Sequence, residues 1–195
     1  MSRIDELADR YFRHIGAPWQ PNLTGAERTT WLVYPKADER KVTFRLPLFE
    51  EKTVAAGHRW VSFDFTSVLH RWFSQLDPDH QLIYLEEPDS LHEELDLQGP
   101  QNSAITSTAI EAVEASLKES GVDENTVVAL SGVGALFGFT RITSVLESIR
   151  KFTPGHLLVL FPGTCDGPQF RLFDTTDGSG YLGVAITPHS SLYDA

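Results

Sequence analysis

The chain opens with apolar residues at the spacing of one helix face. Ser2 and Asp5 have the spacing of a capping box, which places the start of a helix at Ser2. Gly16 and Pro18 end it. Because an apolar stripe must be buried, we expect this helix to pack against the sheet that the following strands predict. The stripe consists of Ile4, Leu7, Ala8, Tyr11 and Ile15.

Between residues 29 and 76, β-rich runs are interleaved with helical stretches. Thr29–Tyr34 and Arg59–Phe65 predict strands, and residues 66–76 predict a helix with its apolar residues on one side. Residues 38–56 fit two interpretations. Val42, Phe44 and Leu46 alternate as in a strand, whereas residues 50–56 look helical and Pro47 suits the first turn of a helix.

The second half of the chain contains the clearest pattern. A helix is predicted at residues 106–120, and Thr126–Leu130 is then a near-continuous apolar run, typical of a strand buried on both faces of a parallel sheet. A glycine-containing turn, a helix at residues 140–152 and a second apolar strand at His156–Phe161 follow. Together they predict a right-handed, parallel βαβ unit. We expect a turn after the second strand, and then a short third strand at residues 170–173.

These elements predict one three-layer α/β domain over residues 1–195, with a mostly parallel sheet. Its topology would be Rossmann-like or P-loop-like, without a Walker A motif. Residues 86–103 are the most polar and acidic stretch, and we interpret them as a surface excursion. The tail from about residue 175 to 195 is expected to be irregular, apart from an edge strand at Tyr181–Ile186.

Composition narrows the class of protein. The 195 residues, 41% hydrophobic and 22% charged, suit one globular domain. The net charge of -11, from 16 basic and 27 acidic residues, disfavours intrinsic nucleic-acid binding, which depends on clustered Lys and Arg. Cys165 is the single cysteine, and no apolar run is long enough to cross a membrane. We therefore expect a soluble, cytoplasmic protein.

The glycine turn is the first candidate site for chemistry. Gly132, Gly134 and Gly138 follow a strand and precede a helix, a context in which backbone amides cradle a phosphate. However, the spacing is GxGxxxG rather than GxGxxG, and no acidic residue ends the next strand to bind a ribose. We favour a structural turn, and keep nucleotide or phosphate binding at Ser131–Gly138 as the alternative.

Other chemical signatures are weak. The seven histidines have no metal-binding spacing, and we expect them to be surface or capping residues. Cys165 has no base near it in the sequence, and Glu50–Lys52, half of a nuclease signature, fits a helix face better than a Mg²⁺ site. The sequence therefore predicts no catalytic residue, no metal ligand and no cofactor, and a protein that is not an enzyme.

Val127–Phe173 contains a distinctive succession of motifs. An apolar strand is followed by a Ser-Gly-Val-Gly turn, an Arg that opens a Leu-rich helix, a second apolar strand, Pro-Gly, Asp-Gly and Arg-Leu-Phe. The residues of this succession are Ser131, Gly132, Val133, Gly134, Phe139, Arg141, Leu146, Pro162, Gly163, Asp166, Gly167, Arg171, Leu172 and Phe173. In this succession the chain resembles the BrxB family of bacteriophage-exclusion (BREX) defence systems.

The resemblance implies a non-catalytic adaptor of an anti-phage defence system. Its implied partners are other BREX proteins, above all the PglZ protein, and a homodimer is also compatible with the sequence. Arg141 and Arg171 flank the predicted turns at the strand ends, where α/β proteins place ligands. We expect them to pair with Asp166 as a structural clamp, with contact to an acidic partner as the alternative.

Overall fold

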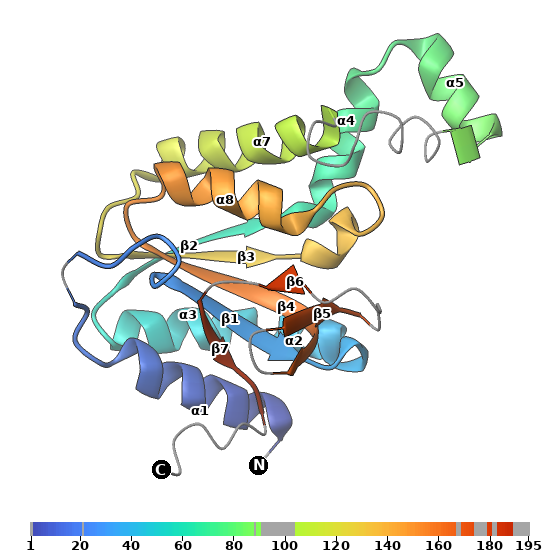
Figure 1. Ribbon diagram of the computed structural model, residues 1–195. Coiled ribbons are helices and arrows are strands. Elements are labelled where there is room, and N and C mark those ends of the chain that lie inside the picture. Colours follow the sequence, from blue (N-terminus) through green and yellow to red (C-terminus); the bar gives the residue numbers. More distant parts are fainter. Residues whose placement is uncertain are drawn as a thin grey trace.

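The computed structural model shows a parallel sheet covered by helices on both faces (Figure 1). It describes residues 2–20, 22–87, 89–90, 104–166, 169–173, 179–180 and 183–188. The helices are α1 (Arg3–Ile15), α2 (Glu39–Phe44), α3 (Leu46–Ala55), α4 (Val68–Gln75), α5 (Pro78–Glu86), α7 (Ala104–Ser120) and α8 (Ile142–Phe152), with the 3₁₀ turns η1 (Lys36–Asp38), η2 (Phe65–Ser67) and η3 (Val133–Leu136).

The strands are β1 (Thr29–Tyr34), β2 (Arg59–Asp64), β3 (Thr126–Ser131), β4 (His156–Asp166), β5 (Gln169–Leu172), β6 (Ser179–Gly180) and β7 (Val184–Ile186). The main sheet has the order β2-β3-β4-β1-β7, and every neighbouring pair in it is parallel. β5 pairs antiparallel with the end of β4, and β6 with β5. The predicted α/β class with a mostly parallel sheet is confirmed.

The side chains of each central strand alternate between two cores. In β1, Trp31 and Val33 pack beneath α4, α7 and α8, whereas Leu32 and Tyr34 pack against α1, α2 and α3. Figure 1 shows these two helix layers above and below the sheet. The chain crosses from β1 to β2 on one face and returns through β3 and β4 on the other. When all crossovers have the same hand, connections that run in opposite directions along the sheet must lie on opposite faces of it.

Local signals explain the start and the middle of the first half. Ser2 caps α1 and accepts a hydrogen bond from the Asp5 amide, while the Asp5 carboxylate accepts one from the Ser2 amide, as predicted. Residues 38–56 are helical, which decides the ambiguity of the sequence. Pro47 lies in the first turn of α3, where its missing N–H removes no helix hydrogen bond.

The prediction that a turn follows His156–Phe161 is wrong. β4 continues through Pro162 and Gly163 to Asp166. Its pairing with β3 stops at Val159, so the missing N–H of Pro162 removes no bond on that side. Gly163 has no room for a side chain because the backbone of Arg171 on β5 approaches it closely.

Two short strands lie in the part of the tail that the structure describes. Val184–Ile186 pairs with β1 and forms the edge of the main sheet, as the predicted edge strand required, and Ser179–Gly180 forms β6. Most of the predicted acidic excursion lies outside the described residues. None of the described helices has both the length and the apolar character of a membrane-spanning helix.

Candidate functional site

The glycine turn at the end of β3 is packed by the chain's own side chains. Gly132 has φ +68°, in the left-handed region that favours glycine. The Asp64 carboxylate and the Thr66 methyl group occupy the space that a β-carbon at position 132 would need. Asp64 is held there because its Oδ1 accepts a hydrogen bond from the Thr66 amide, 2.9 Å away. A carboxylate at this position repels a phosphate, so the turn is better suited to a structural role.

Phe173 covers the second glycine of the turn. A β-carbon at Gly134 would lie 2.5 Å from the Cζ atom of the Phe173 ring. Phe137 meets the same ring edge-on, with ring centroids 5.4 Å apart. By contrast, Gly138 (φ +83°) faces open space. The family-signature residues Gly134 and Phe173 therefore form one packing contact across 39 positions of the chain.

Two of the other predicted site residues meet in the β4–β5 ladder, where the Arg171 backbone approaches Gly163 closely. Arg141 is the N-cap of α8 without a side-chain capping bond, and its side chain is exposed. Arg171 is also exposed, and it pairs with Thr164 in the β4–β5 ladder. The side chain of Asp166 and all of Gly167 lie outside the described residues, so the predicted clamp stays a prediction. Ser131 is buried at the end of β3 and its hydroxyl donates to the Phe63 carbonyl, 3.4 Å away.

At the opposite end of the strands, three histidines gather around Trp19. The Trp19 ring stacks on His58 and on His156, with centroids 3.7 Å apart in both pairs. His14 lines the adjoining hollow of about 460 Å³ together with Trp19 and His156. The expectation that every histidine is a surface or capping residue is wrong here, because residues from α1, β2 and β4 meet at the amino ends of the strands.

Two histidines of this cluster, His156 and His14, have lowered pKa values. Burial, together with the nearby charges of Arg28, His14 and His58, lowers the pKa of His156 to about 4. Burial also lowers the pKa of His14. Within the described residues, no group of three or more His, Cys, Asp or Glu side chains is arranged to hold a metal ion.

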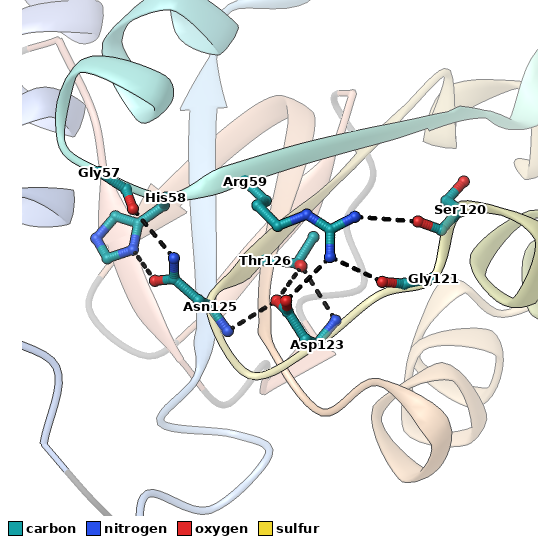
Figure 2. Close-up of polar contacts among 8 residues, drawn as sticks. All are labelled: Gly57, His58, Arg59, Ser120, Gly121, Asp123, Asn125 and Thr126. Carbon is teal, nitrogen blue, oxygen red and sulfur yellow. Dashed lines mark hydrogen bonds and ion pairs between the residues drawn. The ribbon is translucent and has the colours of Figure 1, made fainter.

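Figure 2 shows a polar network at the same end of the strands, around the starts of β2 and β3. Arg59 donates to the carbonyl oxygens of Ser120 (3.2 Å) and Gly121 (2.8 Å), at the end of α7, and to the Asp123 carboxylate (2.9 Å). The Thr126 hydroxyl also donates to Asp123, 2.6 Å away. Hydrogen bonds from Thr126 and Arg59 lower the pKa of Asp123.

The same network orients His58. The Asn125 side-chain amide donates to the Gly57 carbonyl (3.0 Å), which turns its oxygen toward His58 Nδ1, 2.7 Å away. His58 Nε2 faces the Ile15 carbonyl at 3.2 Å. Both ring nitrogens of His58 therefore lie within hydrogen-bonding distance of an oxygen atom. These contacts connect the end of α1 with the starts of β2 and β3, and they indicate that this part of the molecule has a structural role.

A different kind of feature lies on α5, which the sequence analysis did not predict. Leu82, Ile83 and Leu85 are 54%, 47% and 68% exposed, and we call these three side chains the α5 surface. In Figure 1 the helix projects beyond the body of the molecule. Asp77 caps it, and Pro78 follows at its first position. This pair is a recognisable start signal for a helix, although the sequence analysis predicted no helix here.

A second exposed apolar side chain is Phe44, on α2, which is 84% exposed. It lines a hollow of about 730 Å³ with Ser2, Ile4, Ala37, Arg40, Lys41 and Arg45. Sequence periodicity gave no sign of this surface, because Phe44 was counted among alternating strand positions.

Comparison with known proteins identifies the family. The model of the family "BREX protein BrxB" matches residues 80–183, just over half of the chain. The matched region runs from within α5 to beyond β6, and it contains the glycine turn and the Gly134–Phe173 contact. No curated protein and no solved structure matched the chain. The chain therefore belongs to the BrxB family, a component of BREX phage-defence systems.

Proposed function

We propose that this protein is a non-catalytic adaptor of a BREX system, and that it binds a PglZ-type protein directly through the α5 surface. The observation that carries the proposal is the exposure of Leu82, Ile83 and Leu85 on one short projecting helix. Exposed apolar groups that lie together mark interaction sites more often than isolated ones do. The family match begins at residue 80, so this helix lies in the region that the chain shares with its family.

The α5 surface is presented on a held helix rather than on a loose loop. The Asp77 carboxylate accepts hydrogen bonds from the Asp79 and His80 amides, each 3.1 Å away. Tyr84 is buried and stacks on Trp72 of α4, with ring centroids 6.0 Å apart. A helix that is fixed before binding loses less conformational entropy when the partner docks.

The side chains of the α5 surface indicate which kind of partner surface would bind it. Full burial of an aliphatic side chain contributes about 1.5–3 kcal/mol, so covering the exposed parts of these three side chains favours association with a partner. The exposed carboxylates of Asp79, Glu86 and Glu87 lie on or next to the same helix. The expected partner surface is therefore an apolar groove with Lys or Arg at its rim.

Co-purification with the PglZ protein of the same defence system tests the proposal. The double variant Leu82→Ser with Leu85→Ser should lose the PglZ protein and phage restriction together. Both side chains are exposed, so the thermal melting of the variant should match that of the unaltered protein. Val54→Ser is the control, because Val54 is 57% exposed on α3, away from this helix.

The results separate the parts of the proposal. If the double variant retains the PglZ protein and full restriction, α5 is not the docking surface. If the unaltered protein fails to co-purify with the PglZ protein while deletion of its gene still abolishes restriction, another BREX protein is its partner.

A further inference from the structure

We propose that Phe44 and the basic side chains around it form a second docking surface, which binds an acidic segment of a partner protein that carries an apolar side chain. We call Phe44, Arg40, Lys41 and Arg45 the Phe44 surface. It lies outside the region that matches the family, and the proposal does not depend on the role of α5.

The helix geometry explains why Phe44 faces outward. Val42 is fully buried against α1 and α3. Each residue turns an α-helix by about 100°, so Phe44 lies about 200° away from Val42, on the opposite side of α2. The fully buried Phe49, Phe65 and Phe161 show that this fold has room for aromatic rings. Exposure at Phe44 leaves about 1.5–3 kcal/mol of burial free energy for a partner to recover.

The basic side chains at α2 are exposed to solvent, whereas the acidic ones are buried or partly buried. Arg40, Lys41 and Arg45 are exposed, whereas Asp38 is buried and Glu39 is partly buried. Lys41 donates to Asp38 (2.7 Å), Arg3 lies 3.6 Å from the same carboxylate, and the Tyr34 hydroxyl donates to Glu39 (2.7 Å). The acids thus face inward while the cations face solvent.

The exposed charged side chains of this surface are basic, whereas the chain as a whole has a net charge of -11. Arg45 is paired with Asp5 across 3.4 Å, but Arg40 forms no ion pair with any residue that the structure describes. Salt screens interactions between surface charges beyond about 8 Å at physiological ionic strength. A segment that binds next to Phe44 therefore interacts mainly with these nearby cations, and less with the net negative charge of the chain. Arginine's planar fork matches a carboxylate with two parallel hydrogen bonds.

The hollow beside Phe44 favours a protein segment over a nucleic acid. Its apolar wall is formed by Phe44, Ile4 and Ala37, and its volume of about 730 Å³ accommodates a side chain from a partner. Aromatic and Arg residues around an anchoring pocket are typical of the energetic centre of protein interfaces. Nucleic acid would need a longer track of cations than the few on α2 and its flanks.

The two surfaces lie on opposite sides of the sheet. Val42 of α2 belongs to the core under α1 and α3, whereas Tyr84 of α5 belongs to the core under α7 and α8. Figure 1 shows α2 and α5 far apart, on either side of the strands. An adaptor with this layout can hold two partner segments at the same time.

Photo-crosslinking tests the proposal in the host cell, with the full chain and the complete defence system expressed. The photoreactive residue p-benzoylphenylalanine is placed at position 44, and at position 54 as the control. Mass spectrometry then maps the crosslinked segment. The expected product is a segment of another BREX protein with several Asp or Glu residues around an apolar side chain, absent from the position-54 control.

The mapped segment, as a synthetic peptide, then gives the affinity. Phe44→Ala should weaken its binding by about thirtyfold, the effect of an interface hot spot. Arg40→Glu with Arg45→Glu should abolish binding, and Lys in place of the peptide's acidic residues should restore it. Leu82→Ser with Leu85→Ser should leave this affinity unchanged.

Four results would overturn the proposal. They are crosslinks to nucleic acid, crosslinks to a segment without net negative charge, crosslinks to another copy of this chain, and no crosslink above the position-54 control.

Discussion

The ring of Phe173 lies against the backbone of Gly134, so that a β-carbon at position 134 would lie 2.5 Å from the ring's Cζ atom. Position 134 has no room for a larger residue because the side chain of Phe173, directly after β5, lies against it. This contact joins two residues of the family signature and gives the glycine turn a packing role.

Gly134→Ala should lower the free energy of unfolding by about 1–3 kcal/mol, because the added methyl group collides with the Phe173 ring. Urea denaturation measures the change. Adding Phe173→Leu to Gly134→Ala should recover part of the loss, since the smaller side chain leaves room for the methyl group. Gly25→Ala is the control, because its nearest neighbour would be 3.4 Å away. A Gly134→Ala protein as stable as the unaltered one would show that the ring does not fill this space.

Nucleotides and inorganic phosphate should not raise the melting temperature of the protein. Asp64 and Phe173 occupy the space beside Gly132 and Gly134 that a phosphate would need. Because a ligand that binds only the folded state must stabilise it, a thermal-shift screen at millimolar concentrations is sensitive to weak binding. A reproducible shift with a nucleotide or with phosphate would instead support the alternative function.

Arg59→Met should destabilise the protein by about 1 kcal/mol, because it removes the donor that satisfies the carbonyl oxygens at the end of α7. The side chain is 49% exposed, so solvent screening keeps the effect small. Chemical denaturation provides the measurement. Arg71→Met, at an exposed position of α4, is the matched control and should change stability less. Equal effects of the two substitutions would mean that the network in Figure 2 adds nothing.

Stability should fall as the pH drops from about 6.5 to about 4, and His156 should account for part of this fall. The pKa of His156 is about 4 in the folded protein against 6.5 ordinarily, so in this interval the unfolded chain binds a proton that the folded protein does not. The contribution is about 1–2 kcal/mol for a part-exposed ring.

His156→Gln should therefore reduce the difference in unfolding free energy between pH 7 and pH 4.5, whereas His70→Gln, at an exposed position of α4, should not. Denaturation at the two pH values measures the difference. An unchanged difference in the His156→Gln protein would show that the ring is protonated as readily in the folded state as in the unfolded one.

Many of the elements could be predicted because their signals lie among neighbouring residues. The Ser2–Asp5 capping box, the buried run of β3 and the helical spacing in α8 each predicted the element that the structure shows. The start of α5 carries a signal of the same local kind, Asp77 followed by Pro78, although the sequence analysis predicted no helix there.

The candidate sites depended on contacts between distant parts of the chain. Trp19 meets His58 and His156 only after three elements have packed, and Phe173 reaches Gly134 only because β4 continues past Pro162 and returns as β5. No spacing along the chain encodes these approaches.

Hydrophobic periodicity was enough to establish the α/β class and the parallel βαβ unit, because the repeat of a helix or a buried strand is a property of consecutive residues. Exposure is a property of the assembled layers. Val42 and Phe44 stand two positions apart in one short helix, yet one is fully buried and the other is 84% exposed. Only the tertiary structure determines which apolar side chains are buried in the core and which remain exposed, since burial depends on what the rest of the chain places opposite each residue.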